Sequence, residues 1–206
     1  KNYFMLNLLK KLNSELPELL AIIRPTGQKR YPILDELSFI FNQTMNIRYL
    51  AKLVVRNAYL IFESQINILS LYNPTMDCFE MLDTFSLLTN KAQTHILHVD
   101  NSIAMEAAKT STLFSRENLK IEQIKDTITV ISICLRNQCA ILGALSLYRK
   151  KQYTSDEQKN FTLADQELFV QFGDLVANQL DRFLLTGIKE TRRLYQTRKS
   201  VSFYNC

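Results

Sequence analysis

Histidine is the first residue type to consider for metal or acid–base chemistry, and the chain has two, His95 and His98. The pattern around them predicts a short strand, in which side chains three positions apart point to opposite faces. Such a pair shares a metal ion only if the segment is helical instead. We therefore predict no metal site and interpret both residues as satisfied or exposed histidines.

Cysteine is the other candidate, and the four cysteines are Cys78, Cys134, Cys139 and Cys206. They form no C-x-x-C pair and no spacing typical of zinc ligands. Cys134 and Cys139 flank a predicted hairpin turn, where we interpret them as small apolar strand residues with reduced thiols. No G-x-S-x-G nucleophile elbow occurs, and the four glycines form no phosphate-binding loop. We assign no catalytic residue and expect no catalytic activity in this chain itself.

Composition is that of a soluble globular protein, with 206 residues of which 47% are hydrophobic and 22% charged. This length fits one domain with extensions, and no apolar run approaches the roughly 20 residues that span a membrane. Most of the formal charge of +5 lies in residues 187–206, so the body is almost neutral. We therefore expect no nucleic-acid binding by the body. The predicted compartment is the reducing cytoplasm, with an organelle stroma as the alternative.

The elements that would position a site centre on a predicted hairpin. Two apolar runs rich in β-branched residues, Thr127–Leu135 and Cys139–Leu147, are separated by the polar turn Arg136–Gln138. A polar loop follows, and then a helix predicted from Thr162 through Arg182. Thr162 is its expected N-cap, and we expect Gln166 to complete a capping box.

Further elements are expected upstream. Helices are predicted over residues 2–24, 33–41 and 47–61, the last capped by Asn46 and lying on a sheet. Strands are predicted over residues 65–71 and 78–82 around the turn at Asn73-Pro74. Beyond them we expect a helix over 85–93, a strand over 95–99, a helix over 102–109 capped by Ser102, and a loop or partly ordered lid over 110–125. The fold class is α+β.

These residues resemble the GAF domain family over about Ile33 to Phe183. The similar segments are AILGALSLY with Gly143, the FTLAD entry to the last helix, LVANQLDRF, and LDELSFIFNQTMNIRYLAKLVVRNAYLIFESQINILSLYNP. The resemblance implies an antiparallel sheet sandwiched between helices, with the N- and C-terminal helices packed on one face. It divides the chain into a helical extension and linker at 1–31, a GAF domain at 32–186 and a basic helical extension at 187–206.

The resemblance also implies where a ligand would lie. In GAF domains, the irregular segment between the second strand and the late hairpin forms one wall of the cavity, which here is 85–125. We predict a small-molecule site between that segment and the sheet, with an unknown ligand. Its expected lining is Phe85, Ile96, His98, Met105, Phe114 and Ser132.

Specialised members of the family carry signatures that can be compared residue by residue. Bilin-binding members attach the chromophore through a cysteine commonly followed by a histidine, and neither histidine here follows a cysteine. Free methionine sulfoxide reductases use a Gly-Val-Cys-Gly-like segment, which is missing. The cyclic-nucleotide signature departs at its first and last letters, since Arg149-Lys150, Phe161, Asp165 and Gln166 stand there. We interpret Lys150, Phe161 and Asp165 as a structural lock, with Phe161 in the core and Lys150 or Arg149 paired to Asp165.

The chain ends are expected to form a dimer interface, as end helices do in sensory GAF proteins. Apolar residues continue beyond Arg182, and Leu8, Leu12, Leu184, Leu185 and Ile188 are the expected contacts. The alternative is that the last helix folds back over the N-terminal helices. The predicted function is a sensory or regulatory domain that binds a small molecule or passes a signal to a fused or associated output domain. A structural dimerisation module without ligand and a thiol-dependent reductase are the other hypotheses.

Overall fold

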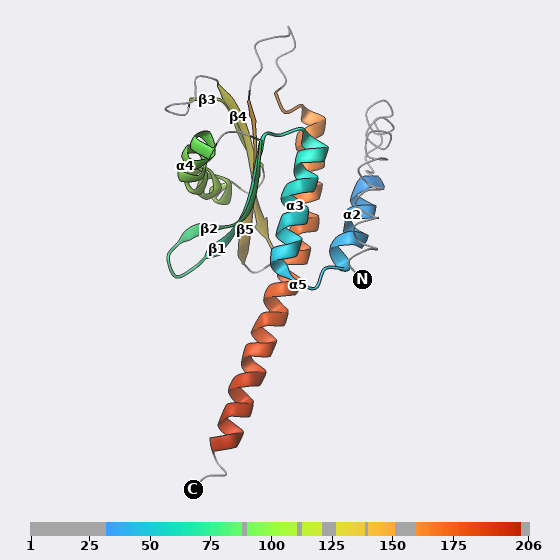
Figure 1. The fold of residues 1–206 in the computed structure, drawn as a ribbon, viewed down its shortest axis with the longest axis vertical. Coiled ribbons are helices and arrows are strands. Elements are labelled where there is room, and N and C mark those ends of the chain that lie inside the picture. The colour runs from blue at the N-terminus through green and yellow to red at the C-terminus, as the bar shows by residue number, and fades with distance from the viewer. Residues whose placement is uncertain are drawn as a thin grey trace.

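The computed structural model describes residues 32–87, 90–110, 113–120, 127–138, 140–150 and 160–202, with side chains in the last helix described as far as Leu185. Within these ranges the fold has three main layers (Figure 1). A five-stranded antiparallel sheet carries α4 on one face and α3 and α5 on the other, and α2 lies outside that helical layer. In the part of the chain that is described, no helix is long and apolar enough to cross a membrane.

The sheet is built from two hairpins joined at its centre. The strands are β1 Ile66–Asn73, β2 Cys78–Ser86, β3 Leu113–Leu119, β4 Ile128–Arg136 and β5 Ile141–Lys150, in the order β2-β1-β5-β4-β3. Both predicted hairpins, β1–β2 and β4–β5, are confirmed.

The β1–β5 contact that joins the two hairpins requires a glycine. A Cβ on Gly143 would lie 2.2 Å from the backbone oxygen of Ser70, closer than any side chain can approach. The glycine on which the family resemblance rested therefore lets the two strands meet.

The helices α2 Pro32–Asn42 and α3 Ile47–Phe62 match the predictions. Asn46 caps α3 as expected, because its side chain accepts hydrogen bonds from the backbone N–H groups of Arg48 and Tyr49. The C-terminal cap, Glu63, adopts a left-handed conformation with φ of 50°. The predicted helix over residues 2–24 lies outside the described residues.

The last helix, α5 Leu163–Ser202, is continuous through Gly187. Its capping box was predicted with the wrong partner. The N–H of Asp165 donates to Thr162 Oγ1 over 3.1 Å, and the N–H of Thr162 donates to Asp165 Oδ2 over 3.0 Å. Gln166 instead donates from Nε2 to the carbonyl of Phe161, because it lies one residue too far along the helix for the reciprocal bond.

The segment between the hairpins differs most from the prediction. Phe85 and Ser86 belong to β2, and a single helix, α4 Asn90–Lys109, replaces the strand and two short helices expected there. The expected loop over 110–125 contains the edge strand β3, whose exposed polar residues weaken the alternation that marks a strand.

The helical conformation of α4 changes the argument about the histidines. Residues three apart share a face of a helix, so the opposite-face reasoning does not apply to His95 and His98. Within the described residues, however, no group of three or more histidine, cysteine or acidic side chains is placed to hold a metal ion. His98 is exposed and His95 is half-buried.

The larger core lies between the sheet and the helices α2, α3 and α5. Its centre is a group of phenylalanines with edge-to-face ring contacts: Phe62 with Phe169 and Phe172, and Phe172 with Phe41. Apolar residues of β1, β4 and β5 complete it. On the other face, α4 covers two smaller clusters, one around Ile66, Ile68 and Tyr148 and one around Phe79 and Ala144.

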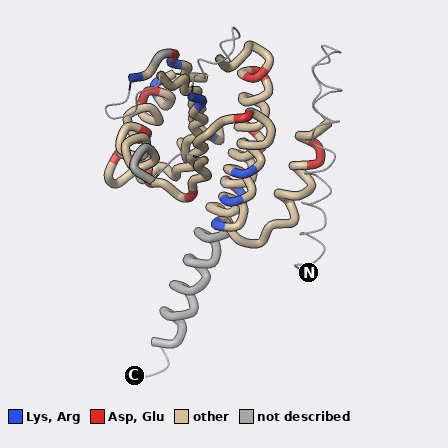
Figure 2. The backbone as a smooth tube through the Cα atoms, turned by 45° about the horizontal axis from the view of Figure 1, so that its top comes forward, with Lys and Arg blue, Asp and Glu red and all other residues tan. Residues whose placement is uncertain are grey.

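Charged residues of both signs are distributed over several of the described elements (Figure 2). The basic residues Arg48, Lys52 and Arg56 form a short exposed row along α3, and acidic residues lie on α2 and other elements. The expectation that the body does not bind nucleic acid stays a prediction.

Candidate functional site

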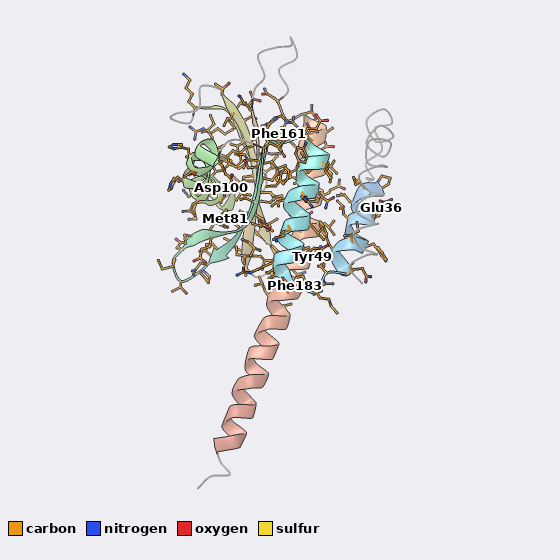
Figure 3. The ribbon with its side chains drawn as sticks, viewed as in Figure 1. Glu36, Tyr49, Met81, Asp100, Phe161 and Phe183 are labelled. Atoms are coloured by element: carbon orange, nitrogen blue, oxygen red, sulfur yellow. The ribbon has the colours of Figure 1, made fainter. Side chains whose placement is uncertain are left out.

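A buried polar network lies between α4 and the sheet, at the place where the sequence predicts a ligand. Tyr148 Oη donates a hydrogen bond to Asp100 Oδ1 over 2.5 Å, and the hydroxyls of Ser132 and Ser146 are 2.9 Å apart. Ser146 also bonds to Asp100. Asp100 is 4% exposed, and the other three side chains are 1% exposed or less. In Figure 3, Asp100 lies between α4 and the sheet, whereas Phe161 lies on the other side of the sheet, beside α5.

Strand register explains why these hydroxyls meet. Ser132 of β4 is paired with Ser146 of β5, and Val130 is paired with Tyr148. Because side chains two positions apart in a strand point to the same face, Ser146 and Tyr148 both point toward α4. The helix contributes Asp100 from the centre of its buried stripe, whose other members are Ile96, Ile103, Ala104 and Ala107.

Electrostatics make Asp100 the reactive member of the network. Burial raises the pKa of its carboxyl from 3.8 to about 6, and the hydrogen bonds from Tyr148 and Ser146 partly oppose that shift. Among the described residues, no cation contributes to the shift. Burial, followed by the neighbouring Asp100 carboxylate, raises the pKa of Tyr148 well above its usual value.

The arrangement can therefore exchange a proton near neutral pH and can accept hydrogen bonds from N–H or O–H groups.

The structure places three of the predicted lining residues at this interface. Ile96 is fully buried in the cluster under α4, Phe114 packs against that cluster, and Ser132 belongs to the network and is paired with Phe114 across β3 and β4. Met105 is half-buried beside the adjacent Phe79 cluster. Their role in ligand binding stays a prediction.

Two predicted lining residues lie elsewhere. His98 is exposed on α4. Phe85 packs on the opposite face of the sheet, where its ring centroid is 4.8 Å from that of Tyr59 in α3. The reason is that Phe85 is part of β2, and its strand partner Asn67 points toward α3.

Sequence reasoning missed Asp100, Ser146 and Tyr148. Two signals could have found them. The residues Ile96, Asp100, Ile103, Ala104 and Ala107 have helical spacing, and an aspartate within such a stripe marks a buried polar group. Ser146 and Tyr148 stand two apart in an otherwise apolar strand.

The region expected to form a structural lock lies at the start of α5. The guanidinium of Arg149, which is 8% exposed, donates to the carbonyls of Asn160 and Phe62. It also lies 3.6 Å from Asp165 Oδ2 and 4.1 Å from the centre of the Phe161 ring. Of the two basic residues proposed, Arg149 therefore makes the ion pair to Asp165, while the backbone N–H of Lys150 donates to Gln65.

The described cysteines, Cys78 and Cys134, are both free thiols. Cys134 accepts a hydrogen bond from Arg136 Nε over 3.3 Å, but burial raises its thiol pKa despite that cation. A raised pKa lowers the thiolate fraction on which nucleophilic reactivity depends. Cys139 and Cys206 lie outside the described residues.

Comparison with known proteins places this geometry in a fold family. Neither a family model nor a curated protein matches the sequence. Solved structures do match, and one is the GAF domain of a phosphoenolpyruvate-protein phosphotransferase from Coxiella burnetii, with 12% identity, a TM-score of 0.56, and 76% of this chain and 95% of that chain covered. The chain has the GAF fold.

Two further structures show the range of proteins with this GAF fold. The GAF domain of a protein classed as a sensor histidine kinase from Pseudomonas syringae pv. tomato is 12% identical, with a TM-score of 0.57, and covers 77% of this chain and 90% of its own. Free methionine-R-sulfoxide reductase from Neisseria meningitidis, solved with its substrate, is 9% identical, with a TM-score of 0.53. The match covers 74% of this chain and 88% of that chain. At these identities the likeness shows the fold, which unrelated activities share.

Proposed function

We propose that the chain is a sensory or regulatory GAF domain that passes its state along α5 to an attached output region, as a dimer. The observation that carries this proposal is the length of α5, which has 40 residues. At 1.5 Å per residue it is about 60 Å long. The longest strand, β5, has 10 residues, which corresponds to about 33 Å. The helix therefore outruns the sheet by roughly 25 Å and continues beyond the body (Figure 1).

α5 is packed against the body as far as Arg182, as a signalling helix must be. Phe169, Phe172 and Val176 are fully buried against the sheet and helices. Near the end of this contact, the guanidinium of Arg182 donates to the carbonyls of Asn42 and Thr44 over 3.2 Å each. A displacement of the sheet face is therefore transmitted to the helix.

The surface where α5 leaves the body supports the dimer. Leu185 is 50% exposed, and Leu184 is half-buried at the edge of the core. A helix that outruns its domain leaves its apolar residues unpaired unless another chain covers them. Leu8, Leu12 and the side chain of Ile188, which complete the proposed interface, lie outside the described residues.

Analytical ultracentrifugation of the full chain tests this function with two exposed leucines of the same helix. We expect a dimer that Leu185→Glu converts to monomer, because the new carboxylate would be buried without a partner. Leu163→Glu is the matched control, since Leu163 is 73% exposed at the other end of α5. A monomeric wild type, or a dimer that survives Leu185→Glu, would contradict the proposal.

The structural dimerisation module stays as a second candidate because of one observation. The space between α4 and the sheet is filled by the domain's own side chains, with Ile96, Ile103 and Tyr148 each 3% exposed or less. Native mass spectrometry of freshly purified chain separates the candidates, since a sensor of a small molecule retains an added mass and the structural module does not.

A further inference from the structure

Asp100 occupies a position where an apolar residue is expected. It stands in the buried stripe of α4, between Ile96 and Ile103, and the sheet opposite presents Ile66, Ile68 and Val130. Aspartate is almost never fully buried without an ionic partner, because taking its charge out of water is costly. The described residues supply hydroxyl groups and no cation to this carboxyl.

We propose that Asp100 is a proton-binding site that holds α4 on the sheet when it is protonated and loosens α4 when it is ionised. The protonated acid can donate to Ser146 Oγ while accepting from Tyr148 Oη, so every polar group of the network has a partner. The ionised carboxylate keeps these two hydroxyl donors but carries a buried charge. Detachment of α4 returns that charge to water.

The contact of α4 with the sheet combines apolar and polar parts. Two of the residues that it buries, Ala104 and Ala107, are alanines, which contribute little apolar area. Two hydrogen bonds also hold α4, from the N–H of Phe79 to Asn101 Oδ1 and from the Arg136 guanidinium to the carbonyl of Ala108. We expect ionisation of Asp100 to weaken this contact.

The other charged and titratable groups on this side of the sheet lie outside the network. By strand register, Tyr72 of β1, Arg116 of β3, Cys134 of β4 and Lys150 of β5 point toward α4. The guanidinium of Arg136, at the end of β4, donates to the carbonyl of Ala108 in α4. The residues of β2 that face α4 do not titrate: Phe79, Met81, Thr84 and Ser86. On α4 itself the described groups are His95, His98, Glu106 and Lys109. The shift at Asp100 comes from burial, Tyr148 and Ser146 alone.

The sign of the pH effect follows from the direction of the shift. The pKa of Asp100 is 3.8 when the carboxyl is free and about 6 when α4 covers it. The hold on α4 is therefore complete below pH 3.8 and is lost as the pH rises through about 6. With these two values, the equilibrium constant for opening α4 is roughly tenfold larger at about pH 7.5 than at about pH 5.

The strand beneath the network connects it to the opposite face. Ser132 belongs to the network, and the next residue, Ile133, points to the other side of β4 and contacts α5 at Gly173. Asp100 is therefore linked to α5 through Ser146, Ser132 and Ile133. The proton site itself does not depend on dimerisation.

Hydrogen exchange of the full-length chain, measured by mass spectrometry and scaled to intrinsic rates, tests the inference. We expect peptides from α4 to exchange roughly tenfold faster at about pH 7.5 than at about pH 5, with peptides from Leu163–Leu185 unchanged. Asp100→Asn keeps the shape of the side chain and should remove the response. Asp174→Asn is the matched control, because burial also raises the pKa of Asp174, but on α5.

Three outcomes would overturn the inference: α4 exchange that does not respond to pH, a response that persists in Asp100→Asn, or an equal response in α5. Tyr148→Phe gives an independent measurement. Its hydroxyl lowers the pKa of Asp100, so its removal should move the midpoint of the α4 response to higher pH. A midpoint that stays in place or moves to lower pH would also reject the proposal.

Discussion

The two faces of the sheet bury different kinds of side chain. The face under α3 and α5 buries Phe169 and Phe172 in ring contact with Phe62, and its buried amides, such as Asn67, donate to backbone carbonyls. The face under α4 buries mostly isoleucine, valine and alanine side chains, together with Tyr148 and Phe79, and places the carboxyl of Asp100 among them. Large aromatic side chains bury the most apolar area and so stabilise the fold most. Burying a carboxyl instead costs free energy. We infer that the first face contributes most to the free energy of unfolding and that the second face, under α4, opens more easily.

The largest expected effect is the loss of an aromatic ring on the α5 face. Phe172→Ala should lower the free energy of unfolding by about 3–5 kcal/mol, because Phe172 is fully buried between Phe41 and Phe62. Urea denaturation followed by circular dichroism measures it. The control is Leu163→Ala on the same helix, where 73% exposure predicts a change below about 0.5 kcal/mol. A cost for Phe172→Ala near that of the control would remove the distinction between the faces.

A smaller effect is expected from two glycines that differ in what surrounds them. Gly143→Ala should cost about 1–3 kcal/mol, because its Cβ would lie 2.2 Å from a backbone oxygen that cannot move independently. Gly173→Ala places a Cβ 3.0 Å from the Ile133 side chain, which can shift more easily than a backbone oxygen, and it gains helix propensity. We expect that change to stay within about 1 kcal/mol. Thermal unfolding of both variants tests the pair, and the reverse order would contradict the strand contact.

The smallest effect is expected at the start of α5. Asp165→Asn should lower stability by about 1 kcal/mol, since it removes the charge at the helix end and the ion pair to Arg149. Exchange of α4 should be unaffected, because Asp165 lies on the other face. Thr162→Ala should cost a similar amount if the capping box is the cause. A change in α4 exchange on Asp165→Asn would show that the faces are coupled more tightly than proposed.

Local patterns in the sequence were sufficient for the elements of the α5 face. The hairpin around Arg136–Gln138 has two uninterrupted apolar runs, and α3 has a regular stripe with Asn46 as its cap, so both were predicted. The family resemblance of the Gly143 segment led to the correct fold.

The α4 face was less predictable for a physical reason. Asp100 interrupts the apolar stripe of α4, so the segment looks like several short elements instead of one helix. The partner that satisfies it, Tyr148, is 48 residues away in the chain. No local pattern reports a hydrogen bond of that separation. The predicted cavity wall, 85–125, also contains the two predicted lining residues that lie elsewhere, Phe85 in β2 and His98 on the exposed side of α4.

The strand order β2-β1-β5-β4-β3 determines when this sheet can form during synthesis. β1 lies between β2 and β5, and β5 is the last of the described strands to be translated. At roughly 5–20 residues per second, the inner edge of β1 waits on the order of ten seconds for its partner. β1 contains the buried residues Ile66, Ile68 and Leu69. An apolar strand with an unpaired edge readily pairs with other chains. We therefore expect a nascent chain that stalls before Ile141 to aggregate. Prompt synthesis of β5 covers the edge of β1 and prevents this.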